Sequence, residues 1–186
     1  MLRRPLPVLA LLLLAGCGDD KDSPPPRQYW AAPKALPDLN YTNEHPLTRS
    51  DVQNSETDAL EQFQILQINQ YRGMVGVPPL ARDPAADALA RAYAKHFTVH
   101  DFFGPVNPEG DALTDRALRA SGYALDGASH ESILYTVGPD PGAMFSAFLN
   151  SPTDYPYIFA TDTNAIGIGI WNSGTLYYVV YNYVTR

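Results

Sequence analysis

The chain has almost no cysteine: Cys17 is the only one among its 186 residues, so no disulfide can form within it. Its folded part must be stabilised by an apolar core, and the chain is long enough to bury one. Basic residues are also scarce, because 13 Lys and Arg stand against 20 Asp and Glu and leave a net charge of -7 at pH 7. This negative charge argues against nucleic acid as a partner and against binding an anionic membrane surface through charge.

The chain also lacks a long apolar run. The run from Leu6 to Leu14 is too short to cross a bilayer as a mature helix. It follows the basic pair Arg3-Arg4 and ends in small residues, which is the layout of a secretory signal. Leu14-Ala15-Gly16-Cys17 resembles a bacterial lipobox, which implies cleavage before Cys17 and acylation of that residue. We therefore expect residues 1–16 to be a lipoprotein signal peptide and the mature chain to be held at a membrane by lipid.

A lipid on Cys17 predicts a place in the bacterial cell envelope, on its periplasmic or cell-surface side. In enterobacterial lipoproteins, an aspartate directly after the lipidated cysteine resembles a signal for retention in the inner membrane. Gly18 is at that position here, so the outer membrane is favoured if the organism is Gram-negative. Asp19 and Asp20 leave the inner membrane open. The alternative is an ordinary signal peptide with a chance cysteine. Cleavage removes two arginines and leaves 11 basic against 20 acidic residues, hence a mature net charge of -9.

Proline and charged residues dominate residues 17–54, which we assign as the lipidated cysteine followed by a Pro-rich linker. Pro24-Pro25-Pro26 favours an extended polyproline conformation. We interpret the segment as a tether that holds the domain away from the membrane. The adjacent aromatic residues Tyr29-Trp30 leave open an alternative in which this segment docks on the domain. Residues 55–186 are expected to form the folded domain.

Helical patterns begin at Ser55 and recur along the domain. Ser55 to Arg72 carries apolar residues at helical spacing, with Ser55 as the cap and Asp58 in the capping-box position. A second helix opens at Asp83-Pro84, where a capping residue precedes a proline at the first helical position. Two shorter helices are predicted at Thr114–Ser121 and Ala143–Leu149, and an irregular segment at Asn150–Pro156.

Strand patterns occupy His130–Val137 and the end of the chain. Ala165–Trp171 and Thr175–Val184 are separated by a short turn and predict a hairpin. In the first of these, Gly167 and Gly169 alternate with isoleucines, so one face lets another element approach closely. The last strand has apolar residues on both faces, which implies a sheet covered on both sides. The expected fold class is α/β, a three-layer α/β/α sandwich.

Two places in the sequence carry side chains suited to chemistry. His130-Glu131 leads into a strand, and a carboxylate at the mouth of a buried strand is unfavourable unless it is paired or opens onto a cleft. We take this strand entry as the floor of a site. His96 and His100 are four residues apart on the second helix, so both could reach one metal ion. No third ligand is obvious nearby, so we favour one histidine at the core edge and the other in solvent.

The order of several short motifs resembles the bacterial CAP domain, also called SCP or PR-1-like, of the cysteine-rich secretory protein family. Individually the matches are weak, but their order and spacing agree over roughly Leu60 to Val184. The resemblance implies a CAP-like sandwich with a mostly antiparallel central sheet. The matching residues are Ile68-Asn69, Arg72, Gly76, Pro79-Leu80, Asp83, Phe102-Phe103, Pro108-Glu109-Gly110, Asp115-Arg116, Gly122-Tyr123, Glu131-Ser132-Ile133, Leu149-Asn150-Ser151-Pro152 and Ile166-Gly167-Ile168-Gly169.

The resemblance also implies a cleft. In the family, two histidines and acidic partners line it, and some members bind zinc or another divalent ion there. Here Pro105 and Asp154 stand at the two histidine positions, and only Glu131 remains at a family cleft position. We therefore expect no metal and no other cofactor. His130 or His100 could substitute in space, so the predicted cleft set is Glu131, His130, His100 and Asp154.

Three functions remain open. The first is a non-enzymatic module that binds a lipid, a peptidoglycan fragment or an envelope protein in its cleft. The second is an envelope hydrolase in which Glu131 and Asp154 form a carboxylate pair with His130 or His100 as the base; no Gly-X-Ser-X-Gly motif accompanies it. The third is a structural role between envelope layers. The first is our preferred hypothesis, because the histidine positions of the cleft are lost.

Overall fold

The computed structural model describes residues 53–119, 125 and 127–186. The predicted signal peptide, Cys17 and nearly all of the linker lie outside the described residues, as does the expected exit of the third helix. The elements, in chain order, are α1 (Ser55–Met74), β1 (Ala81–Arg82), α2 (Pro84–His100), α3 (Leu113–Arg119), β2 (Ser129–Val137), α4 (Pro141–Leu149), α5 (Tyr155–Ile158), β3 (Ala165–Asn172) and β4 (Leu176–Val184).

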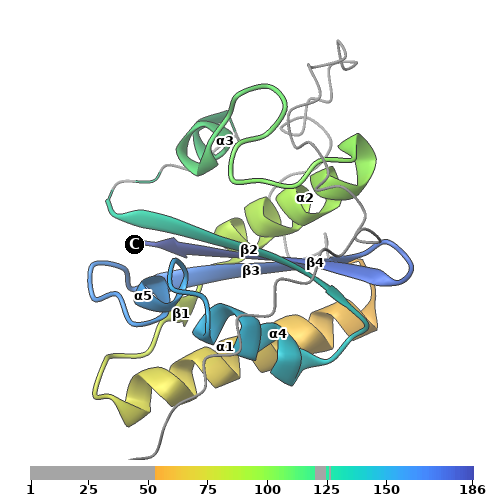
Figure 1. The fold of residues 1–186 in the computed structure, drawn as a ribbon. Coiled ribbons are helices and arrows are strands. Elements are labelled where there is room, and N and C mark those ends of the chain that lie inside the picture. Colours follow the sequence, from red (N-terminus) through yellow and green to blue (C-terminus); the bar gives the residue numbers. More distant parts are fainter. Residues whose placement is uncertain (1–52, 120–124, 126) are drawn as a thin grey trace, which may run out of the picture.

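Three layers form the molecule, as the sequence predicted. The sheet has the order β1-β3-β4-β2, with α1 and α4 on one face and α2 and α3 on the other (Figure 1). The pairs β3–β4 and β4–β2 are antiparallel, and β1 runs parallel to β3. The sheet is thus mixed rather than purely antiparallel. No strand was expected at β1, because a strand of two residues carries no readable periodicity.

Both faces of β4 are buried, which confirms the prediction of a covered sheet. Tyr181 and Tyr183 pack on the side of α1 and α4, and Val180 packs on the side of α2. Gly167 and Gly169 allow α2 to lie directly on β3. A Cβ atom at Gly167 would come 2.0 Å from the Ala86 carbonyl carbon, which is far inside van der Waals contact.

Two local predictions were wrong. Asn54 rather than Ser55 caps α1: its side chain accepts a hydrogen bond from the Thr57 N–H at 3.0 Å, and Thr57 completes the capping box. Asparagine is as good a cap as serine, so the pattern alone does not separate the two positions. The segment expected to be irregular contains the start of α5 at Tyr155. Pro156 does not prevent this short helix, because proline is tolerated in the first turn.

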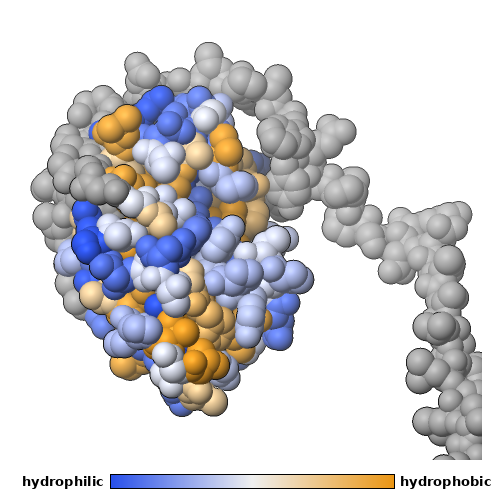
Figure 2. Space-filling view, turned by 90° about the vertical axis from the view of Figure 1, so that its left-hand side faces the viewer, coloured by the Kyte–Doolittle hydropathy of each residue, from blue (hydrophilic) through white to orange (hydrophobic). Residues whose placement is uncertain are grey.

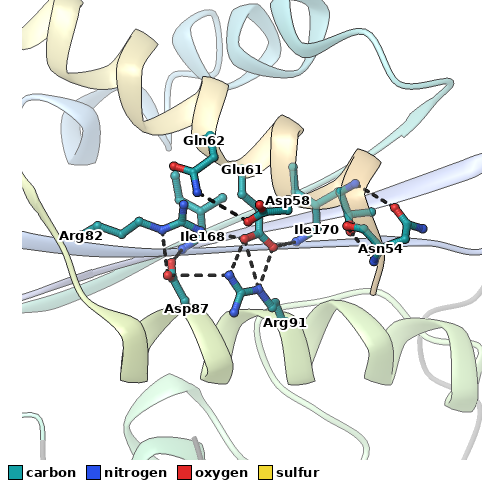
Figure 3. Close-up of polar contacts among 10 residues, drawn as sticks. Asn54, Asp58, Glu61, Gln62, Arg82, Asp87, Arg91, Ile168 and Ile170 are labelled. Carbon is teal, nitrogen blue, oxygen red and sulfur yellow. Dashed lines mark hydrogen bonds and ion pairs between the residues drawn. The ribbon is translucent and has the colours of Figure 1, made fainter. Parts of the chain in front are cut away.

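The outer edge of β3 is closed by side chains beyond β1. Asp87 accepts a hydrogen bond from the Ile168 N–H at 2.8 Å, and Glu61 accepts one from the Ile170 N–H at 3.2 Å (Figure 3). Gln53 then bonds both the N–H and the carbonyl of Asn172, at 2.7 and 2.8 Å. Three alternate residues of the strand thus have their outward N–H groups satisfied.

Two arginines neutralise the carboxylates at that edge. Arg91 pairs with Glu61 at 2.5 Å, and Arg82 bridges Glu61 and Asp87 at 2.7 Å each (Figure 3). Burial raises the pKa of Glu61, and the bond from Arg91 opposes that rise. Because the four charges cancel and hold α1, β1, α2 and β3 together, we assign this cluster a structural role.

Apolar surface gathers elsewhere. Figure 2 shows hydrophobic residues toward the lower end of its view, the side of the molecule where Figure 1 places α1. At the end of that helix Met74 is 72% exposed, and Val75 follows at 60%. This apolar surface lies on the opposite side of the sheet from α2 and α3.

Candidate functional site

Glu131 projects from β2 toward α3, where it forms an ion pair with Arg116. Both side chains are buried, with 0% of Arg116 and 6% of Glu131 exposed. Arg116 also donates to the carbonyls of Pro105 and Asp111, at 3.1 Å each. Its guanidinium carbon lies 3.4 Å from the ring centre of Tyr93. We call these five residues the Arg116 cluster.

Local folding places the arginine there. Leu113 and Ala117 of α3 pack against α2, and Arg116, one residue before Ala117, is buried on the same side of α3. The loop before α3 is closed by Asn107, whose side chain accepts a hydrogen bond from the Asp111 N–H at 2.6 Å. This closed loop brings two backbone carbonyls to the guanidinium.

Several buried polar atoms of the site have no hydrogen-bond partner within the described part of the chain. They are Glu131 Oε2, Arg116 Nε and both amide atoms of Asn182. Asn182 lies directly opposite Glu131 on β4, so their side chains share one face of the sheet. Burial raises the pKa of Glu131, while the charge of Arg116 opposes the rise. Such a combination of donors and acceptors is suited to a small polar ligand or a water.

The two histidines of α2 lie beside this cluster. The ring centres of His96 and His100 are 4.2 Å apart, and His96 Nε2 is 3.7 Å from Glu109 Oε2. Burial, together with the charges of His100 and Arg116, lowers the pKa of His96 to about 3, so His96 is neutral at physiological pH. His96 is buried at the core edge, as expected, and His100 is half-buried rather than solvated.

His130 lies on the other face of the sheet from Glu131. Successive residues of a strand point to opposite faces, and both residues belong to β2. The His130 ring stacks on Tyr157 of α5 with 4.5 Å between centres, and its Nε2 lies 3.3 Å from Asp162. The structure therefore does not bring together the Glu131–His130 pair of the hydrolase hypothesis.

Asp154 is also remote from the Arg116 cluster. It accepts a hydrogen bond of 2.5 Å from Ser151 at the start of α5. Burial and the charge of Asp154 raise the pKa of Tyr183, which packs on the α1 and α4 side. Of the four predicted cleft residues, Glu131 and His100 thus lie on the α2 side of the sheet, and His130 and Asp154 lie with the elements on its other side.

The residues present do not fit the divalent ion that the family resemblance implies. Pro105 offers only its carbonyl, which accepts a hydrogen bond from Arg116. Glu131 pairs with the same guanidinium, whose positive charge would repel a metal cation. Among the described residues, no three His, Cys, Asp or Glu side chains come together in a group that could hold a metal ion.

Arg116 was not among the site residues predicted from the sequence. It was named only as part of the Asp115-Arg116 motif of the family resemblance. A usable signal was present, because Leu113 and Ala117 place the neighbouring arginine at the edge of the buried face of a short helix. A buried arginine requires a partner, and Glu131 is a carboxylate at the entry of a buried strand, where it requires a partner too.

The fold is similar to that of solved bacterial structures. An extracellular protein containing a SCP domain from Bacillus anthracis matches with a TM-score of 0.63 and 20% identity, over 70% of this chain and 41% of that one. An outer surface protein from Borrelia burgdorferi matches with a TM-score of 0.60 and 18% identity, over 70% of this chain and 95% of that one. A cysteine-rich secretory protein from Staphylococcus aureus matches with a TM-score of 0.59 and 13% identity, over 71% of this chain and 40% of that one.

The chain thus spans less than half of the Bacillus anthracis protein. A comparison with curated proteins found no match. Within residues 53–119 and 127–186, no helix combines the length and apolar character needed to cross a bilayer. The profile of the cysteine-rich secretory protein family, CAP, matches residues 66–184, which is more than half of the sequence. The chain therefore belongs to the cysteine-rich secretory protein family.

Proposed function

We propose that this protein is a non-enzymatic binding module of the bacterial cell envelope, anchored by lipid on Cys17. The observation that carries the proposal is the ion pair between Arg116 and Glu131. The one acidic residue left at a family cleft position is neutralised by the chain's own guanidinium. A guanidinium stays protonated near neutral pH, so it can hold a ligand but cannot exchange a proton with one.

The atoms around this pair indicate the kind of ligand. Arg116 Nε can donate, Glu131 Oε2 can accept, and the Asn182 amide can do both. A group that carries a donor and an acceptor together, such as the amide groups of a peptidoglycan fragment, matches this set. Lipid headgroups with hydroxyls offer a similar pattern, and an envelope protein is the remaining class of ligand.

Several observations support the location. Leu14-Ala15-Gly16-Cys17 resembles a lipobox, and Gly18 after the cysteine favours the outer membrane in a Gram-negative host. The similar structures are named as an extracellular protein and an outer surface protein. Replacement of Cys17 by serine is expected to move the protein from the membrane fraction to the soluble fraction. A Cys17→Ser protein that stays with the membranes would refute the anchor.

Binding is tested by thermal shift against a panel of peptidoglycan fragments and lipids. We expect at least one compound to raise the Tm of the wild type, and the Glu131→Gln variant to lose that rise. Asp162→Asn is the matched control, because it removes one carboxylate from the opposite face, where the side chain is 56% exposed. If no compound binds, or if the wild type turns over a panel member and Glu131→Gln does not, the non-enzymatic binding role is wrong.

A further inference from the structure

The two edges of the sheet are treated differently. Along β3, the outward N–H groups beyond β1 are taken by Asp87, Glu61 and Gln53. At the other edge, among the described strands, β2 pairs with β4 alone. Within the described ranges, no hydrogen bond from outside the sheet reaches the backbone of residues 133–137. Among the described residues, one edge is therefore closed and the other is open.

The register shows which groups of β2 face outward. The Ile170 N–H points away from β4, since it is bonded to a carboxylate at the outer edge of β3. Backbone groups alternate in an antiparallel ladder, so Val179, the partner of Ile170, directs its N–H and carbonyl toward β2. On β2, Leu134 is the partner of Val179, and the two residues are joined by backbone hydrogen bonds. Its neighbours Ile133 and Tyr135 must then direct their N–H and carbonyl groups outward.

The side chains of this open stretch suit another strand. Tyr135 is 48% exposed and Val137 is 76% exposed, and the stretch from Ile133 to Val137 holds no charge and no proline. Phe103 meets Tyr135 edge-on at 5.1 Å and provides an aromatic wall beside it. Native proteins usually protect a long edge with charges, proline or a bulge, and none of these occurs between Ile133 and Val137.

Charge indicates the partner. Asp162 lies at one end of β2, beside His130, and Asp140 follows its other end. The cations of residues 53–186 are otherwise engaged. Arg72, Arg82, Arg91 and Arg116 lie in buried or partly buried contacts, Arg119 and Arg186 pair with aspartates, and Lys95 lies over Trp171. A second copy of this chain would bring the same acidic residues, whereas a basic segment would be attracted.

We infer that the outer half of β2, Ile133–Val137, is a strand-addition site for an extended segment of another protein, with β-branched or aromatic residues flanked by basic ones. Main-chain hydrogen bonds to the outward groups would provide the affinity, and the Tyr135–Phe103 wall would select the facing side chain. The inference goes beyond the proposed function, because it depends neither on the lipid anchor nor on a ligand at the Arg116 cluster.

Amide hydrogen exchange tests it in the mature chain, kept soluble by Cys17→Ser. The probe is the capped heptapeptide Lys-Val-Thr-Val-Thr-Val-Lys, and the same peptide with glutamate in place of lysine is its control. When nine-tenths of the protein is bound, exchange at Ile133, Tyr135 and Val137 is expected to slow about tenfold, because only the free fraction exchanges. Exchange at Leu134 is expected to stay unchanged, since that amide is already bonded to β4.

Tyr135→Pro removes one outward N–H and is expected to weaken peptide binding, whereas Tyr135→Thr keeps that N–H as the matched control. Should the proline variant fail to fold, the exchange pattern of the unmutated strand still decides. No slowing, or equal slowing of outward and inward amides, overturns the site. Protection that grows with protein concentration alone means that a second copy occupies the edge, and equal binding of the glutamate peptide removes the basic partner. Each of these results overturns the proposal as stated.

Discussion

Removal of the Arg116 charge is the perturbation that probes the site most deeply. In Arg116→Met the carboxylate of Glu131 loses its only ion-pair partner in the described structure while its side chain stays 6% exposed. Breaking a buried pair from one side costs about 3–5 kcal/mol. Glu131→Gln keeps the shape and leaves Arg116 its two carbonyl acceptors and the Tyr93 ring, so it should cost about 1–3 kcal/mol.

The variant that carries both Arg116→Met and Glu131→Gln measures the interaction between the two side chains. With both charges gone no unpaired ion remains, so the double variant should be more stable than the sum of the single effects, by about 1–3 kcal/mol. Burial raises the pKa of Glu131 and Arg116 opposes the rise, so Arg116→Met raises that pKa further. A carboxyl whose folded pKa is raised loses stability as the pH rises through that pKa. The loss in Arg116→Met should therefore shrink on acidification.

Urea unfolding of the wild type, the two single variants and the double variant at pH 7.5 and pH 5 measures these differences in unfolding free energy. Single effects that add within about 0.5 kcal/mol would show that the two side chains do not interact. A loss in Arg116→Met that grows on acidification would show that Glu131 is not the buried ionised partner. Either result would refute the account of the pair.

Two further predictions concern the surroundings of the site. The pKa of His96 in the folded protein is lowered to about 3 from an ordinary 6.5, so its contribution to stability is complete above pH 6.5 and is lost as the pH falls. Between pH 7 and pH 5 the unfolding free energy of the wild type should therefore drop by about 2 kcal/mol more than that of His96→Gln. Parallel pH profiles of unfolding free energy would contradict this. In Gly169→Ala the new Cβ would lie 2.1 Å from the Arg91 backbone nitrogen, so we expect a loss of about 3 kcal/mol or more by urea unfolding. Gly73→Ala is the control, because its Cβ meets nothing within 4 Å and alanine favours a helix over glycine by about 0.5–1 kcal/mol. If Gly169→Ala left the unfolding free energy unchanged, the close approach of α2 to β3 would be contradicted.

Features with a strong local cause could be predicted from the sequence. Asp83-Pro84 specifies the start of α2, and the hairpin of β3 and β4 follows from its alternating pattern. The glycines of β3 indicated a close neighbour, because a missing side chain has few other uses at two alternate positions. These signals act over a few residues, so no tertiary information is needed to read them.

The site depended on contacts that the sequence does not display. Arg116 meets Glu131 only after α3 docks on α2, which places residues 15 positions apart in contact. His130 and Glu131 were expected to share a site because they form one polar pair at a strand entry. The observed strand begins one residue earlier, at Ser129, so both residues lie within the ladder and face opposite sides.

Arg116 pairs with Glu131, the one acidic residue left at a family cleft position, and so keeps that carboxylate from holding a metal ion. This pairing is tested most directly by calorimetric titration of Zn²⁺ into tag-free mature protein carrying Cys17→Ser, in parallel with the same protein carrying Glu131→Gln. The account predicts the same heats for both proteins, because Glu131 is paired with Arg116 and holds no ion. Saturable binding of one ion that Glu131→Gln abolishes would contradict it.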